Sequence, residues 1–216
     1  AVVSGSALRI KNTDHYQNGD GTTGPYNDGS ANVGEWAART AGAWGNNLKV
    51  SVCPSPTAYE AVNKTTTNDA STAVGDTVVT VTSGSNISAG DIVNFGDNFE
   101  YRVVSVSTNN LNIVRKDEPA YFGTSDSSGL HAVITDSSNV RRRWRHYDLF
   151  DKAPGTSPFV QANGGSGDEI HVVVVDEDGQ ITGTKGDVLE TFGALSKATD
   201  AKTAQGSTNY YPDVIY

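Results

Sequence analysis

The chain has 216 residues, 36% of them hydrophobic and 23 of them glycine, which suffices for one or two packed domains with many turns. Its formal net charge is -9, so we expect no nucleic-acid partner, because affinity for a duplex comes from Lys and Arg side chains that neutralise phosphates. The apolar runs are too short to span a bilayer, and we expect no membrane partner either. Abundant Ser, Thr, Asn and Gly favour β-structure with many polar turns and long loops over a helical bundle.

Two observations bear on compartment and chain origin. The single cysteine, Cys53, excludes an internal disulfide and follows a predicted strand over 48–52, where we expect it to be a small buried hydrophobe. A lone cysteine of this kind is typical of a cytosolic protein. The chain contains no methionine, so we expect Ala1 to result from processing or to begin a piece of a larger protein.

The N-terminal third contains short predicted elements separated by turns. A loosely alternating stretch at 2–11 predicts a strand, and repeated Asn, Asp and Gly residues between 18 and 31 predict irregular structure. Residues 35–39 fit one helical turn, and 48–52 alternate with the period of a strand. Threonine, asparagine and serine then dominate 63–73, a composition typical of a linker.

Four short runs rich in β-branched and aromatic residues follow this linker. Turn residues separate them, and the spacing predicts a small antiparallel, barrel-like sheet. We therefore expect residues 74–116 to form an inserted β-module, and 1–62 with 117–216 to form the principal, discontinuous α+β domain. The runs are Val78–Val81, Asp91–Phe95, Glu100–Val106 and Leu111–Val114.

The C-terminal half contains the most apolar strand of the chain. Residues 129–134 predict a further strand, and Ile170–Val175 includes four consecutive valines. Because these valines do not alternate with polar residues, both faces of their strand should be covered at the centre of a sheet. A hairpin turn at Gly179 leads to 188–195, whose spacing suits either a strand or a short helix.

The strongest local charge feature of this otherwise acidic chain is a cluster of four arginines next to Trp144 in the sequence. They are Arg141, Arg142, Arg143 and Arg145. Guanidinium groups pair bidentately with carboxylates or phosphates and stack on indole rings. Since the rest of the chain is acidic, pairing with carboxylates of this chain or of a neighbouring copy is a simpler expectation than binding of RNA. We interpret the four arginines as candidate subunit-contact residues.

Residues that could support catalysis or metal binding lack the spacing that such sites require. Asp176, Glu177 and Asp178 precede Gly179, but they do not match a calcium-binding EF-hand loop and favour a solvated turn. Paired carboxylates such as Glu169 and Asp176 could suggest a hydrolase, yet nothing sets their separation across a cleft. We therefore expect no catalytic, cofactor-binding or metal-binding residues and no enzymatic activity. The histidines lie in four separate segments, at His15, His131, His146 and His171.

Four segments follow one another in an order that resembles a known family. A turn at 41–50 leads into a strand; the valine strand then runs into Asp176–Gly179, followed by 188–197 with the pattern V-x-E-x-F-x-x-L-S and by Tyr210–Ile215. This succession resembles the contractile tail sheath proteins of myovirus-type bacteriophages, most closely those of cyanobacterial and marine myoviruses. Residues 8–12 and 150–157 add support to the resemblance. The resemblance favours a strand over a helix after the hairpin. One departure is Tyr216, which stands where the family commonly has Asn.

The resemblance implies a structural role. The chain would be the outer and middle part of a sheath subunit, a mixed-sheet α+β domain whose copies stack as hexameric rings around the tail tube and contract to drive it through the host envelope. Its partners would be other sheath subunits and the tube and baseplate proteins, in a virion tail assembled in the host cytoplasm. No cofactor is implied. The isolated fragment should be monomeric, because ring assembly in the family depends on arms and a C-terminal domain outside these residues.

A carbohydrate-binding or adhesin module on a virion or cell surface is the alternative. The small predicted β-module fits such a role, and Tyr26, Trp36 and Trp44 could line a sugar platform. Aromatic residues beside glycine turns are, however, more often part of a domain core.

Overall fold

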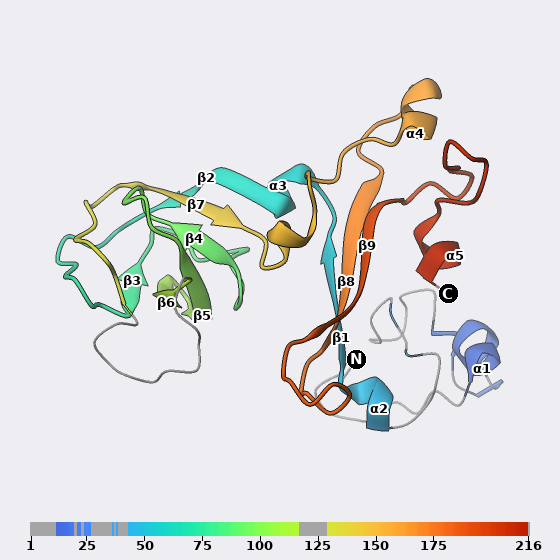
Figure 1. The fold of residues 1–216 in the computed structure, drawn as a ribbon, viewed down its shortest axis with the longest axis horizontal. Helices are drawn as coiled ribbons and strands as arrows, with labels where there is room; N and C mark the ends of the chain where they lie inside the picture. Colours follow the sequence, from blue (N-terminus) through green and yellow to red (C-terminus); the bar gives the residue numbers. More distant parts are fainter. Residues whose placement is uncertain are drawn as a thin grey trace. The chain divides into compact units, whose positions relative to one another are not determined.

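The computed structural model describes residues 12–19, 21, 22, 24–26, 36, 38, 43–116 and 129–215. Within them the protein is β-rich, as predicted, with short helices and two antiparallel sheets in place of the expected mixed sheet (Figure 1). No helix of this described part is long and apolar enough to cross a membrane. The chain divides into two compact units, 1–52 with 156–216, and 53–155. The strand predicted at 2–11 lies outside the described residues, as do half of segment 18–31 and most of segment 35–39.

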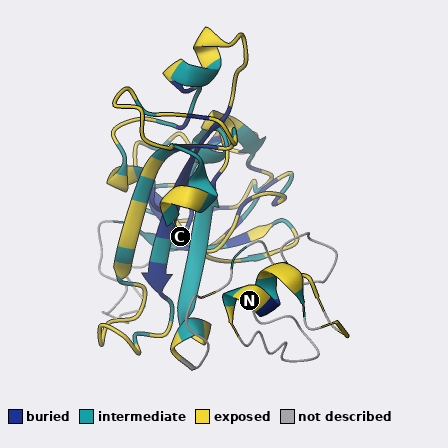
Figure 2. Cartoon of the chain, turned by 90° about the vertical axis from the view of Figure 1, so that its right-hand side faces the viewer, coloured by how far each residue is buried: buried dark blue, intermediate teal, exposed yellow. Residues whose placement is uncertain are grey.

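The first unit contains a three-stranded sheet in which β8 (Glu169–Asp176) lies between β1 (Leu48–Cys53) and β9 (Val188–Ser196) (Figure 1). Every residue of β8 except Val174 is buried (Figure 2). This confirms that the valine-rich strand is central and covered on both faces. β9 confirms a strand after the hairpin, and Cys53 is buried as predicted.

The core of this unit gathers segments that are far apart in the sequence. Its buried centre consists of Ile170, Val172 and Leu195. Partly buried residues that pack against this centre come from both ends of the unit, and they are Trp36, Val50, Val52, Phe192, Tyr211 and Ile215. The helices of the unit are α1 (Thr13–Asn18), α2 (Ala43–Asn46), α4 (Pro158–Ala162) and α5 (Tyr211–Ile215).

The second unit is built on one six-stranded sheet in the order β2-β7-β4-β5-β6-β3, and its neighbouring strands pair antiparallel. The strands are β2 (Glu60–Thr66), β3 (Val78–Thr80), β4 (Ile92–Asn94), β5 (Tyr101–Ser107), β6 (Asn110–Arg115) and β7 (Asn139–Arg143). The unit also contains the short helices α3 (Pro56–Tyr59) and η1 (Tyr147–Leu149). The four strands predicted within 74–116 are thus confirmed as β3 to β6.

Side chains alternate across these strands, so one face of the sheet forms the core of the second unit. In β5, for example, Tyr101 and Val103 are buried whereas Arg102 and Val104 are exposed. The buried face belongs to one apolar cluster, which comprises Val79, Val81, Ile87, Val93, Phe95, Tyr101, Val103, Leu111, Ile113, Leu130, Ile134 and Val140.

This unit is wider than the module predicted over 74–116. β2 and β7 lie outside that range, yet β7 pairs with both β2 and β4 in the same sheet. Residues 63–66 are therefore strand and not linker, because threonine-rich sequence suits β-structure as well as a flexible connection. Residues 129–134 form no strand, but Leu130 and Ile134 are buried in the core.

The two edges of the six-stranded sheet meet just beyond β2 and β3. Thr67 and Val81 form an isolated antiparallel bridge, and Thr82 N donates to the Thr66 carbonyl at 2.8 Å. The sheet therefore curls until its edges touch at this point. Within the described part of the chain, however, no continuous ladder joins β2 to β3, so the pairing does not establish a closed barrel.

Candidate functional site

The arginine-rich strand β7 is the most strongly charged element of the second unit, and its arginines divide between two faces. Successive residues of a strand project to opposite sides, so Arg141 and Arg143 share one face and Arg142 lies on the other. β7 is flanked by β2 and β4, which bring segments from far along the chain against both of its edges. The carboxylates on these neighbouring segments decide what each arginine contacts.

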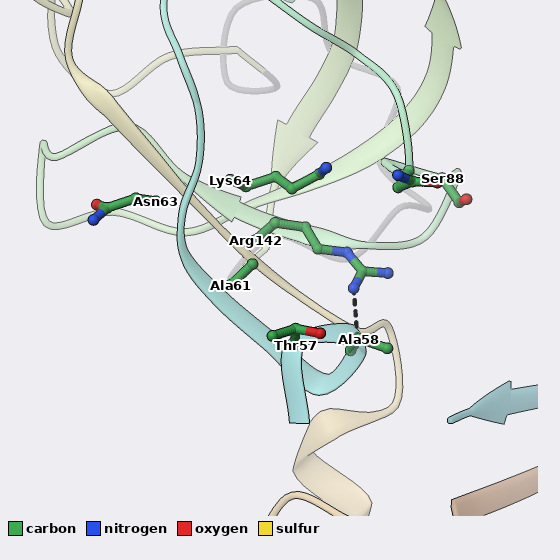
Figure 3. Close-up of a pocket in the computed structure, with 8 residues that line it drawn as sticks. Thr57, Ala58, Ala61, Asn63, Lys64, Ser88 and Arg142 are labelled. Carbon is green, nitrogen blue, oxygen red and sulfur yellow. Dashed lines mark hydrogen bonds between the residues drawn. The ribbon is translucent and has the colours of Figure 1, made fainter. Parts of the chain in front are cut away.

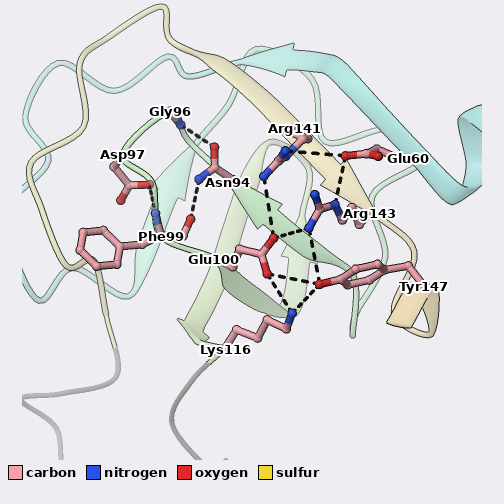
Figure 4. A network of polar contacts seen from close by, with 10 residues as sticks. All are labelled: Glu60, Asn94, Gly96, Asp97, Phe99, Glu100, Lys116, Arg141, Arg143 and Tyr147. Atoms are coloured by element: carbon pink, nitrogen blue, oxygen red, sulfur yellow. Dashed lines mark hydrogen bonds and ion pairs between the residues drawn. The ribbon is translucent and has the colours of Figure 1, made fainter. Parts of the chain in front are cut away.

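Arg143 is held by two carboxylates of its own unit (Figure 4). Its Nε donates to Glu60 Oε1 at 3.0 Å, and its Nη1 donates to Glu100 Oε1 at 2.6 Å. Lys116 Nζ donates to Glu100 Oε2 at 2.8 Å and to the Tyr147 hydroxyl at 2.5 Å. The Tyr147 ring faces both cations, with Arg143 Cζ 4.9 Å and Lys116 Nζ 4.8 Å from its centroid. These five side chains form one polar network.

The network favours the charged forms of Glu100, Lys116 and Arg143. Partial burial opposes ionisation of Glu100, but the hydrogen bond and charge of Lys116 and the charge of Arg143 outweigh it and lower the pKa of Glu100. Burial likewise opposes the charges of Lys116 and Arg143, but the acceptors of their hydrogen bonds raise both pKa values. Arg143 is therefore committed to partners within its own chain.

Arg142 forms a largely buried ion pair on the opposite face of β7. Its Nε donates to Asp91 Oδ2 at 2.8 Å, and its Nη1 donates to the Ala58 carbonyl. The side chains of Arg142 and Asp91 are only 12% and 2% exposed. Asp91 also accepts a hydrogen bond from the Ser88 amide. Such a pair braces the fold, because removal of either partner leaves a buried charge without compensation.

Within the described part of the chain, neither Arg141 nor Arg145 makes a side-chain hydrogen bond to a carboxylate. Arg141 lies 3.8 Å from a carboxylate oxygen of Glu60 and of Glu100, and 36% of its side chain is exposed. Arg145 packs against Gly90, where a Cβ atom would lie 2.9 Å from Arg145 Nε. The four arginines predicted to contact other subunits thus differ. Arg142 and Arg143 form hydrogen-bonded intramolecular ion pairs, and Arg141 forms only the two longer ones.

Trp144 and His146 pack together directly after β7. The Trp144 ring stacks on Phe150 with centroids 5.8 Å apart and meets His146 edge-on at 5.2 Å. His146 is 8% exposed, and its buried Nε2 makes no hydrogen bond with any residue that the structure describes. Burial, followed by the charge of Arg145, lowers the pKa of His146 to about 4 against the opposing effect of Asp148.

We expect His146 to make the chain less stable as the pH falls from about 7.5 to 5.5. The unfolded chain binds a proton near the ordinary histidine pKa of 6.5, whereas folded His146 stays neutral down to about pH 4. This stability is present above pH 6.5 and declines towards pH 4, by about 1 kcal/mol over the measured interval once solvent screening is allowed for. Urea unfolding at both pH values, with His131→Gln as control, should show that His146→Gln removes the decline. An unchanged decline in His146→Gln would contradict this origin.

The acidic segment at 176–178 is a structural turn. Desolvation opposes ionisation of buried Asp176, but hydrogen bonds from backbone amides and from the Thr182 hydroxyl outweigh it and lower its pKa. The expected solvated turn is therefore wrong for this carboxylate, although Asp178 is exposed. No group of His, Cys, Asp and Glu side chains in the described ranges could hold a metal ion. The Asp176 carboxylate accepts hydrogen bonds of 2.8 to 3.1 Å from the backbone amides of Gly179, Gln180, Ile181 and Thr182.

The aromatic residues that could line a sugar platform have different surroundings. Tyr26 is buried against His15, with ring centroids 5.2 Å apart, and Trp36 packs on Tyr211 at 5.7 Å. Trp44, by contrast, is 64% exposed. Tyr26 and Trp36 thus follow the usual role of such residues as part of a domain core.

Comparison of the chain with protein-family models, with curated proteins and with solved structures finds no match. The function must therefore be inferred from the order of the segments that resemble sheath proteins and from the structure that these segments adopt. The four main segments are β1, β8, β9 and α5, which belong to the first unit except for Cys53 at the end of β1. Of the supporting segment 150–157, residues 150–155 belong to the second unit.

Proposed function

We propose that this chain is part of a contractile tail sheath subunit of a myovirus-type bacteriophage. One observation carries the proposal: the four main segments that resemble sheath proteins are distant in sequence but assemble into one folded unit. β1, β8 and β9 pair in one sheet, and Tyr211 and Ile215 of α5 pack against its core. A succession of motifs that is also one packed unit supports a shared fold better than motifs scattered over separate units would.

The second unit fits this proposal as an insertion. The chain leaves the first unit after Val52, forms the six-stranded sheet and its own core, and returns at Thr156. We include in the proposal that this curled sheet is a small barrel-like module carried by a sheath domain. An insertion with its own core can be accommodated without disturbing the host domain, because few contacts need to cross the boundary.

The proposed role requires assembly and no chemical step in this chain. Copies would stack as hexameric rings around the tail tube, and contraction would release energy stored in an extended lattice that is metastable relative to the contracted one. Of the four clustered arginines, Arg141 and Arg145 are proposed to contact acidic surfaces of neighbouring copies. The isolated chain is proposed to be monomeric, which sedimentation at micromolar concentration checks.

Immunogold electron microscopy of phage particles containing the full-length protein tests the proposal. Antibodies raised against the 216-residue chain should label the tail along its length in extended particles and the shortened sheath in contracted ones. Antibodies absorbed beforehand with the purified chain provide the control. Label confined to fibres or to the tail tip would contradict the sheath role and favour the adhesin alternative. Absence of label from tails would contradict both roles.

A further inference from the structure

An open depression of about 570 Å³ on the second unit lies outside the contacts that the sheath proposal uses (Figure 3). It is bordered by α3, by β2, by Arg142 of β7 and by the loop that precedes β4. Its volume lies within the range typical of small-molecule sites. The polar residues of its lining are Thr57, Asn63, Lys64, Asn86, Ser88 and Arg142.

Two cations face this depression. Figure 3 shows the side chains of Lys64 and Arg142 extending from β2 and β7 towards the loop that carries Ser88. The Lys64 ammonium makes no hydrogen bond or ion pair with any residue of the described ranges. Arg142 uses Nε and Nη1 for Asp91 and Ala58, which leaves Nη2 as its remaining donor group.

The local charge selects the kind of anion that fits. Asp91 neutralises Arg142 through the ion pair at 2.8 Å, so the excess positive charge of the depression is the single charge of Lys64. A monoanionic carboxylate balances this charge, whereas a phosphate group carries up to about two negative charges at neutral pH and would be left undercompensated. The site therefore suits one carboxylate.

The uncharged lining suits hydroxyl groups next to that carboxylate. The Ser88 hydroxyl and the Asn86 carboxamide are exposed, and neither side chain is hydrogen-bonded to another residue that the structure describes. Hydroxyl and carboxamide groups both donate and accept hydrogen bonds, as sugar hydroxyls do. The described lining contains no aromatic ring, so a neutral sugar would find no stacking surface to replace the charged contact.

We propose that this depression binds a carboxylate-bearing saccharide, such as a chain of uronic acid units. Lys64 Nζ binds the sugar carboxylate, Arg142 Nη2 supplies a second donor, and Ser88 and Asn86 bind neighbouring hydroxyls. The proposal is independent of the sheath role, since it depends on the geometry of the second unit alone.

Titration of the ¹⁵N-labelled chain, followed by amide chemical shifts, tests the proposal with defined probes. A tetramer of galacturonic acid should shift amides around 57–64 and 86–88, and the matched galactose tetramer should not. Lys64→Gln should weaken binding by about tenfold, because it removes a charge-assisted hydrogen bond. Lys185→Gln, at an exposed lysine of the first unit, should bind like the unmodified chain, and Lys64→Arg should retain binding.

The titration also contains the outcomes that overturn the proposal. Equal binding of the galactose tetramer would show that the carboxylate is not recognised, and unchanged binding by Lys64→Gln would remove Lys64 from the site. A tetraglutamate peptide or inorganic phosphate that shifts the same amides with equal or higher affinity would replace the saccharide as ligand. Shifts confined to other regions, or none at the depression, would exclude a site there. The same spectra show whether each variant is folded.

Discussion

Replacing Arg142 by alanine is expected to destabilise the chain by about 3 kcal/mol, because it leaves the Asp91 carboxylate buried without its cation. Asp91 is 2% exposed, so water cannot take over the role of the guanidinium without opening the structure. The same change also removes the hydrogen bond to the Ala58 carbonyl. Urea unfolding of the purified chain at neutral pH measures the difference in the free energy of unfolding.

Arg141→Ala is the matched control on the same strand. Its guanidinium lies 3.8 Å from its nearest carboxylates and is 36% exposed, so its removal should cost less than about 1 kcal/mol. In a double variant, Asp91→Ala should recover part of the loss caused by Arg142→Ala, since no unpaired charge remains. Equal, small effects of Arg141→Ala and Arg142→Ala would refute the internal brace and leave both arginines available for contacts between subunits.

Removing the second unit, 53–155, and bridging the cut with a short Gly/Ser linker is expected to leave the first unit folded. β1 begins where β8 ends, because Glu177 N donates to the Asn47 carbonyl at 2.7 Å. Its far end therefore lies towards the start of β8, where Ser157 N donates to Asp168 Oδ1 at 2.8 Å. The two ends to be joined lie near the same end of β8, so a short linker can connect them.

Removing only 74–116 should leave the first unit folded but unfold what remains of the second unit. That deletion takes out β3, β4, β5 and β6 and most of the apolar cluster, and the β2–β7 pair that remains is too small to be stable alone. Amide spectra and urea unfolding should show a cooperative first unit in both deletions, with disordered signals from the residual second-unit segments in the smaller one. A cooperative, dispersed remainder of the second unit after deletion of 74–116 would support the narrower boundary.

Local sequence patterns determined the strands whose identity depends on near neighbours. The valine run predicted β8 as a buried central strand, because a strand without alternating polar residues is covered on both faces. The runs that became β3 to β6 were recognisable from β-branched residues between turns. The same local signals failed for β2, because its threonines and asparagines suit a linker as well as a strand, and composition does not reveal a pairing partner.

Tertiary structure alone decided what the charged residues do. The sequence marks Arg141 to Arg145 as a cluster, but Glu60 and Glu100 are 83 and 43 residues from Arg143, and only the strand order brings them to it. From the sequence, Asp176 is likewise one of several expected surface carboxylates. In the structure, the backbone amides of the following turn donate hydrogen bonds to it. Strand periodicity and burial act over a few residues and can be read along the chain. Ion pairs depend on the register between distant strands, which emerges when the apolar cores form.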